Sequence, residues 1–363
     1  MFSEDLFFMK AIIAMSGGVD SSVAALLMQA QGHECIGATM KLFQNEDIGL
    51  TREHTCCSLE DVEDARQVAR SLGIPHYVFN FSSRFRQCVI DRFVQSYENG
   101  ITPNPCIDCN RYLKFDKLMQ RMRELDYDCV VTGHYARIEY DGASGRHLLK
   151  RALDSAKDQT YFLYSMTQRQ LAHSCFPLGN LTKPQVRRIA EDHGFINARK
   201  HDSQDICFVQ NGNYASFIEG YAGKAYPPGD FIGPDGSVIG RHRGVIHYTV
   251  GQRKGLNIAY GEPLYVRAID PAGNRIFLGR NADMLTHTVT ARNINLISVP
   301  GLERPVRVQA KLRSCQQAQW ATAVQSDEDA LEIRFDAPQR IPAKGQAVVL
   351  YDGDTVVGGG TIQ

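Results

Sequence analysis

The chain has 363 residues, of which 43% are hydrophobic and 22% charged, and this composition excludes collagen, coiled coil and intrinsic disorder. Its 40 Lys and Arg residues balance 40 Asp and Glu residues, so the overall charge does not indicate a nucleic-acid partner, and any basic surface must be local. At roughly 100–200 residues per domain, this length predicts two or three domains.

The first segment, MFSEDLFFMKAIIAM, places acidic residues before a short apolar run. A signal peptide has basic residues there, and no apolar run approaches the ~18 residues of a transmembrane helix. We therefore expect a cytoplasmic protein. Its ten cysteines are then reduced, and most of them should act as small buried hydrophobic residues.

Short apolar runs alternate with amphipathic segments over about the first 210 residues. The pattern predicts strands at 10–15, 33–41, 76–81 and 129–133, and helices at 21–31, 59–72, 84–99 and 112–125. This alternation is typical of an α/β fold with a doubly wound, mostly parallel sheet.

A glycine-rich loop, SGGVDSS, lies between the first strand and the first helix. Gly17 and Gly18 allow backbone amides to approach a phosphate, and the helix N-terminus adds amide donors and a positive dipole end. Asp20 suits a Mg²⁺ ion held by nucleotide phosphates. The alternative is a glycine turn with a serine cap, but the strand before and the helix after favour phosphate binding. The loop is not a Walker A motif, because GxxxxGK[ST] is absent.

Two cysteines, Cys106 and Cys109, stand in the segment TPNPCIDCN. The prolines at 103 and 105 disfavour a regular helix there, so we expect a rigid loop that opens into a helix near Tyr112. A thiol at a helix N-terminus has a lowered pKa and is a better nucleophile or metal ligand. Cys207, in KHDSQDICFV, follows a basic stretch that also favours the thiolate.

These cysteines allow three interpretations: catalytic or cluster-binding sulfur chemistry, a structural zinc site, or simple burial. Zinc is disfavoured because no second CxxC or CxxH pair follows at short spacing. The Pro-Asn-Pro frame disfavours simple burial of Cys109. Of the remaining cysteines, the Cys56–Cys57 doublet stays undecided, and apolar surroundings predict core positions for Cys35, Cys88, Cys129 and Cys175.

The composition changes after about residue 208. Gly, Pro and Tyr become frequent, and from about residue 283 only short strand-like runs occur, which predict a C-terminal β-barrel or sandwich. We therefore expect three domains: an α/β domain with the glycine-rich loop over 1–212, a small central α+β domain over 213–281, and a β-barrel over 282–363. Between Arg241 and Arg280 there are seven basic residues and only two acidic ones, which indicates contacts with RNA phosphates; the alternative is an ordinary solvated surface.

Six motifs occur in a fixed order: SGGVDSS, TPNPCIDCN, TGHYAR, KDQTYFL, DSQDICF and GQRKGL. The first resembles the loop of the PP-loop ATP pyrophosphatases, which cleave ATP between its α and β phosphates. Together, the six resemble the bacterial tRNA-specific 2-thiouridylases over nearly the whole chain. That family installs the 2-thio group on the wobble uridine, position 34, of tRNA.

The resemblance implies that ATP, with Mg²⁺, activates the 2-oxygen of the target uridine by adenylation. Cys207 carries a persulfide received from a sulfur-relay protein or cysteine desulfurase, and Cys109 is the nucleophile, leaving a Cys109–Cys207 disulfide. It implies that ATP is bound by Ala14, Met15, Ser16, Gly17, Gly18, Val19, Asp20, Ser21, Met40 and Gly133. It implies contacts with the target base from Asn104, Pro105 and Cys106, and with the anticodon loop of tRNA from His134, Lys157, Asp158, Gln159, Arg313, Ser314 and Gln346.

One residue departs from the family pattern. Many members carry Asp at the position of Cys106, as a general acid or base beside the nucleophile. With Cys there, a [4Fe–4S] cluster on Cys106, Cys109 and Cys207 is an alternative, and Asp108 could supply the missing carboxylate. We favour the persulfide route because it needs no further assumption. Other rivals are a different PP-loop ATP-dependent ligase and a non-catalytic iron–sulfur or zinc protein that binds RNA.

Overall fold

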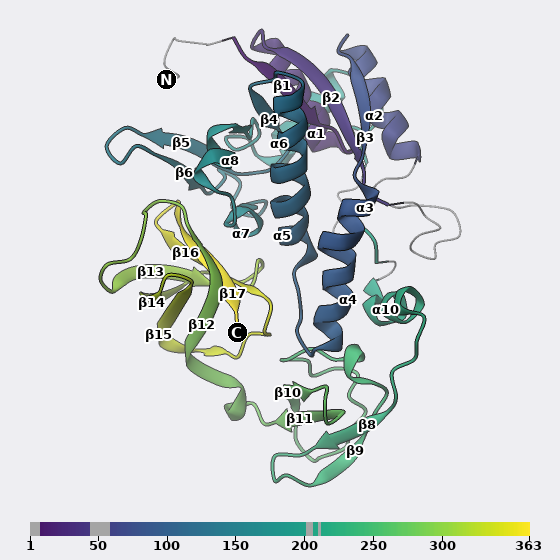
Figure 1. The fold of residues 1–363 in the computed structure, drawn as a ribbon, viewed down its shortest axis with the longest axis vertical. Coiled ribbons are helices and arrows are strands. Elements are labelled where there is room, and N and C mark those ends of the chain that lie inside the picture. Colours follow the sequence, from purple (N-terminus) through teal and green to yellow (C-terminus); the bar gives the residue numbers. More distant parts are fainter. Residues whose placement is uncertain (1–7, 44–58, 201–205, 210–211) are drawn as a thin grey trace. The chain divides into compact units, whose positions relative to one another are not determined.

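The computed structural model describes residues 8–43, 59–200, 206–209 and 212–363, and Figure 1 shows its fold. The chain forms two compact units. The first comprises Met1–Arg86, Ile107–Phe208 and Asp354–Val356; the second comprises Gln87–Cys106, Val209–Gly353 and Val357–Gln363. The predicted division into three consecutive domains remains a proposal.

A five-stranded parallel sheet forms the centre of the first unit. Its order is β3-β2-β1-β4-β7, with bounds His76–Asn80, Glu34–Lys41, Lys10–Ala14, Cys129–Val131 and Ser174–Cys175. Ala11, Ile12 and Ile13 of β1 are fully buried, and successive residues of a strand point to opposite faces. Both faces of the sheet are therefore covered, which confirms the predicted doubly wound α/β class.

Three helices share a hydrophobic core with one face of this sheet: α1 (Val19–Ala30), α2 (Leu59–Ser71) and α9 (Lys183–Asp192). Val23, Val68 and Val186 each contribute a buried side chain to it. Each of these helices has apolar residues three or four positions apart, and burial of that stripe fixes it against the sheet.

The strand order reverses at β1. From β1 the chain crosses to β2 on one side, and β4 pairs with β1 on the other. In open α/β sheets, ligands bind outside the carboxyl ends of the strands at such a reversal. The loops that follow β1 and β4 therefore form the expected ligand site of this unit.

Two helical runs follow β3. The first contains α3 (Ser82–Phe85), η2 (Arg86–Ile90) and α4 (Asp91–Glu98), and the second contains α5 (Pro105–Cys109), η3 (Asn110–Lys117) and α6 (Leu118–Glu124). The predicted start of the second helix near Tyr112 is wrong, because the helix begins at Pro105. Proline is well placed in the first turn, where its missing N–H has no intrahelical partner. Cys106 and Cys109 thus lie in the first turns of a helix.

A hairpin and short helices complete the first unit. They are β5 (Arg137–Asp141), β6 (Arg146–Lys150), α7 (Thr160–Leu163) and α8 (Gln168–Ala172). Lys150 of β6 pairs with Thr355, so a short piece of the C-terminal strand belongs to this unit.

The second unit contains a small mixed sheet and a barrel. The sheet has the order β10-β11-β8-β9, with bounds Tyr265–Asp270, Arg275–Gly279, Gly229–Ile232 and Val238–His242, and α10 (Tyr214–Ala222) precedes it. Single turns η5 (Val245–His247) and η6 (Ala282–Met284) follow β9 and β11. The ring centroids of Phe93 in α4 and Phe217 in α10 lie 6.3 Å apart, so these two helices pack together within this unit.

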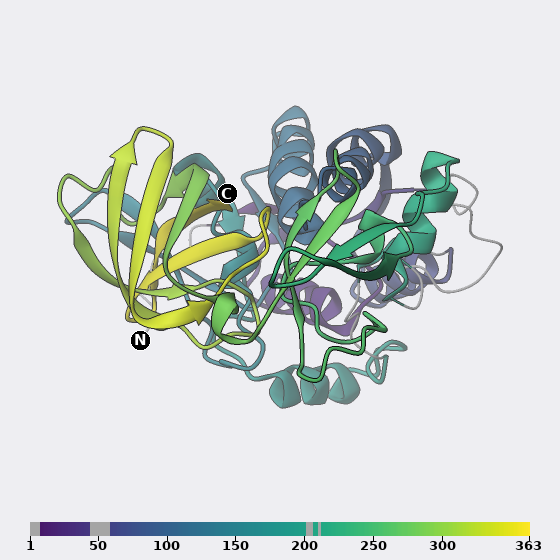
Figure 2. The same ribbon diagram turned by 90° about the horizontal axis from the view of Figure 1, so that it is seen from below.

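Six antiparallel strands form the C-terminal barrel: β12 (Leu285–Leu296), β13 (Val306–Lys311), β14 (Gln319–Asp327), β15 (Ala330–Arg340), β16 (Ala347–Asp352) and β17 (Thr355–Ile362). Pairing of β12 with β17 closes the barrel (Figure 2). Its inward side chains form one hydrophobic core. Closure removes the exposed strand edges, and the predicted β-barrel is confirmed. None of the helices that the structure describes is long and apolar enough to span a membrane.

Candidate nucleotide-binding and catalytic site

The glycine-rich loop lies at the carboxyl end of β1. Gly17 has φ +75°, and a Cβ there would lie 2.3 Å from the carbonyl oxygen of Asp61, so only glycine fits. The hydroxyls of Ser21 and Ser22 donate to the Gly18 carbonyl at 3.0 and 3.1 Å. The first turn of α1 follows directly, and its amides have no partner further back in the helix. The loop therefore has the backbone arrangement of a phosphate cradle.

Gly133, just beyond β4, lies against the start of α1. A Cβ on Gly133 would come within 2.8 Å of the backbone of Asp20 and Ser21. The structure therefore brings this glycine together with the loop, although the two are more than a hundred residues apart in the sequence. Met15 is buried beneath the same edge, and the Thr39 hydroxyl donates to the Met15 carbonyl at 2.7 Å beside half-buried Met40.

Asp20 is bound by two side chains that the sequence analysis did not identify. The Lys183 ammonium lies 2.7 and 2.8 Å from its two carboxylate oxygens, and the Tyr135 hydroxyl donates to it at 2.9 Å. The side chain of Lys183 is only 8% exposed, so its charge is held at the loop. One signal was available: Lys183 is the first residue of a helix, where a cation opposes the helix dipole and needs a compensating partner.

Asn197 and Lys200 fix the segment that leads towards Cys207. The Asn197 amide donates to the Gly17 carbonyl and to the Ser22 hydroxyl, both at 2.9 Å, and this residue is almost completely buried. The Lys200 ammonium binds the carboxylates of Asp61 and Asp64 at 2.7 and 2.5 Å. These bonds tie the chain between 197 and 200 to the phosphate loop and to α2.

The predicted catalytic cysteines are both half-buried. Cys109 ends α5, and the next residue, Asn110, donates its amide to the Phe162 carbonyl at 3.0 Å. Cys207 precedes Phe208, whose buried ring packs edge-on against Phe85 at 5.8 Å. The residues before Cys207 in its motif, 202–205, lie outside the described part of the chain, as does the Cys56–Cys57 doublet.

The cysteines predicted to be structural are in the core. Cys35, Cys88 and Cys129 are buried, and Cys175 is partly buried. Burial raises the pKa of Cys35 to about 11, that of Cys129 to about 12 and that of Cys175 to about 11. These thiols stay protonated at neutral pH and are poor nucleophiles, because the thiolate is the reactive form.

An iron–sulfur cluster would require Cys106, Cys109 and Cys207 to converge. Among the residues that the structure describes, no three His, Cys, Asp or Glu side chains gather so that they could hold a metal ion. Mg²⁺ carried by nucleotide phosphates is a different case, because it needs only one or two protein carboxylates, and Asp20 offers one.

Several residues predicted to contact tRNA have their side chains engaged within the first unit. His134 is buried against Phe115 and Phe176 and hydrogen-bonds Thr132 at 2.7 Å; burial, then Lys114, lowers its pKa well below the usual value. Lys157 is partly exposed on the loop before α7. Asp158 accepts from the Thr160 hydroxyl at 2.8 Å, and Gln159 accepts from the Tyr135 amide at 2.8 Å.

The remaining predicted contacts lie in the second unit. Gln346 donates its amide to the carbonyls of Thr102 and Pro103, at 2.9 and 3.1 Å, directly before Asn104. Arg313 and Ser314 are exposed on the barrel. Pro105 is buried at the start of α5, and Cys106 is exposed. The structure thus joins the predicted base-contacting segment to the barrel through Gln346.

The fold and this loop define a PP-loop α/β unit followed by a β-barrel. Family profiles match along the chain: the profile described as "tRNA methyl transferase HUP domain" matches 9–211, "tRNA methyl transferase PRC-barrel domain" matches 215–280, and "Aminomethyltransferase beta-barrel domain" matches 286–362.

Curated relatives match over the full length. The tRNA-specific 2-thiouridylase MnmA of Clostridioides difficile is 48% identical over 354 residues, covering 98% of each chain. The protein of the same name from Acetivibrio thermocellus is 48% identical over 355 residues, covering 98% of this chain and 99% of the relative. The chain belongs to the family of tRNA-specific 2-thiouridylases. Among solved structures, a 4-thiouridine synthetase–RNA complex with bound ATP is 17% identical, covers 59% of this chain and 50% of that one, and has a TM-score of 0.38, too low to support a conclusion here.

Proposed function

We propose that this protein is an ATP-dependent sulfurtransferase that converts the wobble uridine of tRNA, position 34, to 2-thiouridine. Apart from family membership, the observation that supports this proposal most strongly is that the first unit contains both the phosphate loop and the two cysteines. Three parts of the proposed site belong to this one unit: the phosphate loop, Cys109 and the chain that leads to Cys207. Cys109 is the last residue of α5, and its neighbour Asn110 is held by a hydrogen bond to the Phe162 carbonyl. We propose that the reaction takes place in the cytoplasm.

The first step activates the uridine. A carbonyl carbon of the pyrimidine ring is a poor electrophile, and adenylation of its oxygen supplies a leaving group. The 2-oxygen attacks the α-phosphate of ATP, and pyrophosphate leaves. The loop Ser16–Ser22 and the N-terminus of α1 would hold the phosphates, and Asp20 would hold the Mg²⁺ that accompanies them. Ala14, Met15, Met40 and Gly133 would complete the nucleotide site.

The second step transfers sulfur. A donor protein, a sulfur relay or a cysteine desulfurase, leaves a persulfide on Cys207. The terminal sulfur attacks C2 of the adenylated uridine, and AMP departs. The Cys109 thiolate then attacks the Cys207 sulfur, the sulfur–sulfur bond breaks with its electron pair on the new 2-thio group, and a Cys109–Cys207 disulfide forms. An external dithiol must reduce this disulfide before the next turnover.

The alternatives are weaker on specific grounds. A cluster-dependent route needs a ligand set that the described residues do not form. A non-catalytic RNA-binding protein would have no use for the phosphate loop. A PP-loop ligase that transfers nitrogen would not need Cys109 and Cys207.

The experiment separates the two half-reactions in the purified enzyme with tRNA, ATP and a persulfide donor. We expect tRNA-dependent pyrophosphate release to persist in Cys207→Ser and Cys109→Ser, because adenylation precedes sulfur transfer. Formation of 2-thiouridine, measured by nucleoside mass spectrometry, should fall to background in both.

Cys106→Ser tests the rival route in the same assay, and Cys315→Ser, an exposed barrel thiol, is the matched control. Both should keep normal thiolation without iron. Full thiolation by Cys207→Ser would disprove the persulfide route, and loss of an iron-dependent activity in Cys106→Ser would establish the cluster.

A further inference from the structure

The two glycines of the phosphate loop leave its backbone with a choice of two orientations. Gly17 has φ +75°, and glycine tolerates both signs of φ, so the peptide that joins Gly17 to Gly18 can turn either face outward. In a planar trans peptide, the carbonyl and the following N–H point in opposite directions. The Gly18 N–H can therefore reach a phosphate only if the Gly17 carbonyl is held on the opposite side of the loop.

Asn197 holds that carbonyl. Its Nδ2 atom lies 2.9 Å from the Gly17 oxygen and 2.9 Å from the Ser22 hydroxyl oxygen. A carbonyl oxygen can only accept, so the atom that faces it is the amide nitrogen, whose two hydrogens serve the two acceptors. Ser22 in turn donates to the Gly18 carbonyl at 3.1 Å. One side chain thus fixes two consecutive carbonyls, the first directly and the second through Ser22.

The amides that follow these two carbonyls are left for a ligand. In the part of the chain that the structure describes, no acceptor binds the N–H groups of Gly18 and Val19. Val19 begins α1, and the other amides of that first turn also have no partner further back in the helix. Successive backbone N–H groups at a turn that opens into a helix form an anion-binding concavity.

The Asn197 side chain is itself firmly held. It is 2% exposed, and its Oδ1 atom is buried without a hydrogen-bond partner among the described residues. An unpaired buried acceptor opposes folding, so the two bonds made by the nitrogen determine how this amide is oriented. Three residues further on, the Lys200 ammonium binds Asp61 and Asp64 at 2.7 and 2.5 Å, which fixes the turn that carries Asn197.

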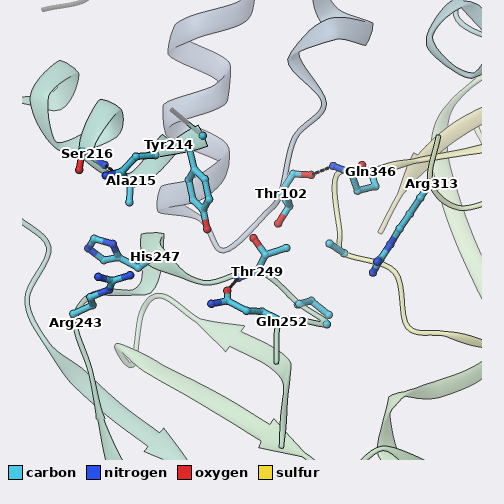
Figure 3. A pocket seen from close by; sticks show the side chains of 15 residues that line it. Thr102, Tyr214, Ala215, Ser216, Arg243, His247, Thr249, Gln252, Arg313 and Gln346 are labelled. Carbon is cyan, nitrogen blue, oxygen red and sulfur yellow. Dashed lines mark hydrogen bonds between the residues drawn. The ribbon is translucent and has the colours of Figure 1, made fainter. Parts of the chain in front are cut away.

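The second unit fixes a backbone segment by the same means. The Gln346 amide donates to the carbonyls of Thr102 and Pro103 at 2.9 and 3.1 Å, beside a polar cavity (Figure 3). In each unit, a side-chain amide from a distant part of the chain holds a segment that lies outside the helices and strands. The amide suits this task because its nitrogen carries two hydrogens.

We infer that Asn197 is a positioning residue for adenylation: it selects the loop conformation in which the Gly18 and Val19 amides face the phosphates of ATP. The inference rests on the proposed function, which makes ATP a substrate of the first step. Asn197 acts through the backbone of the loop, because its two donors are already used by Gly17 and Ser22.

The test compares the affinity of the full-length protein for ATP with Mg²⁺ and for adenosine, which has no phosphates. Asn197→Ala should weaken ATP binding about tenfold, as for the loss of one hydrogen-bonded restraint, and leave adenosine binding unchanged. Asn197→Asp keeps the shape of the side chain, but its carboxylate cannot donate to Gly17 and accepts from the Gly18 N–H instead. That variant should weaken ATP binding about a hundredfold, because it removes a phosphate donor and adds a negative charge.

The matched control is Gln29→Ala. The Gln29 amide also donates to a backbone carbonyl, that of Leu72, but near the opposite end of α1 from the loop. Gln29→Ala should bind both ligands like wild type.

Equal losses of ATP and adenosine affinity in Asn197→Ala and Asn197→Asp would overturn the inference, because Asn197 would then only stabilise the fold. Stronger ATP binding by Asn197→Asp than by Asn197→Ala would also overturn it, since the shape of the side chain and not its donors would then matter. The proposed function fails separately: a protein with the expected pattern of ATP affinities that never forms 2-thiouridine refutes thiolation and leaves the role of Asn197 intact.

Discussion

At the scale of single residues, the Asp20 carboxylate is the most informative group. It lies in the phosphate loop, and the Lys183 ammonium binds both of its oxygens. The positive charge of Lys183 therefore neutralises the negative charge of Asp20. A Mg²⁺ ion arriving with nucleotide phosphates would compete with that ammonium for Asp20. Because the side chain of Lys183 is buried next to the loop, we expect its displaced ammonium to pair with the incoming phosphates.

We predict that Lys183→Met lowers the rate of tRNA-dependent pyrophosphate release by about 10²-fold, the typical loss on removing one group that stabilises developing negative charge. Pyrophosphate release by the purified variant measures this. The control is Arg188→Met on the same helix, an arginine whose side chain is 83% exposed. An unchanged rate in Lys183→Met would show that the lysine only compensates Asp20.

The sequence was sufficient to predict the loop residues but not the residues that hold them. Ser16 to Ser22 form a contiguous motif between a strand and a helix, and local pattern identifies such motifs. Lys183 and Asn197 reach the loop from more than 160 residues away. The position of Lys183 at the start of a helix indicates that its charge needs a partner but not which one, and nothing local distinguishes Asn197 from other polar residues of a turn. The packing of α9 against α1 reveals the partner of Lys183, and the hydrogen bonds to Gly17 and Ser22 reveal the role of Asn197.

At the scale of elements, the ends of β1 and β4 determine the site. The predicted strands and helices of the first unit are confirmed because their apolar periodicity is strong. The start of the helix at Pro105 was misjudged because proline was treated as a breaker, although it is favoured in the first turn. The consequence is positional: Cys106 and Cys109 lie in the first turns of that helix.

The contact between the two strand ends gives a second prediction. Gly133→Ala should reduce pyrophosphate release at least about tenfold, because the new Cβ would come within 2.8 Å of the backbone at Asp20 and shift the start of α1. The matched control is Gly142→Ala in the β5–β6 turn, where a Cβ meets nothing within 4 Å. Steady-state kinetics for ATP provide the measurement; equal behaviour of the two variants would mean that the loop tolerates displacement.

At the scale of the whole molecule, the sequence predicted the classes of the parts. The closed barrel and the parallel sheet follow from strand spacing and from strand–helix alternation. Residues 87–106 group with the second unit, where Tyr221 donates to Asp91 at 2.6 Å and Lys224 binds Glu98 at 2.7 Å. Such pairings join segments more than a hundred residues apart, so no local pattern could predict them.

The proposed activity also makes a prediction at the level of the cell. If this chain thiolates the wobble uridine, tRNA from a strain without its gene should lack 2-thiouridine at position 34. Wild-type protein should restore the nucleoside. The Cys207→Ser protein, although able to bind ATP and tRNA, should not restore it.

The most direct measurement is therefore mass spectrometry of tRNA nucleosides from the deletion strain, complemented with either protein at matched expression. The account predicts loss of 2-thiouridine in the deletion strain, full recovery with the wild type and none with Cys207→Ser. Unchanged 2-thiouridine in the deletion strain, or full recovery with Cys207→Ser, would contradict it.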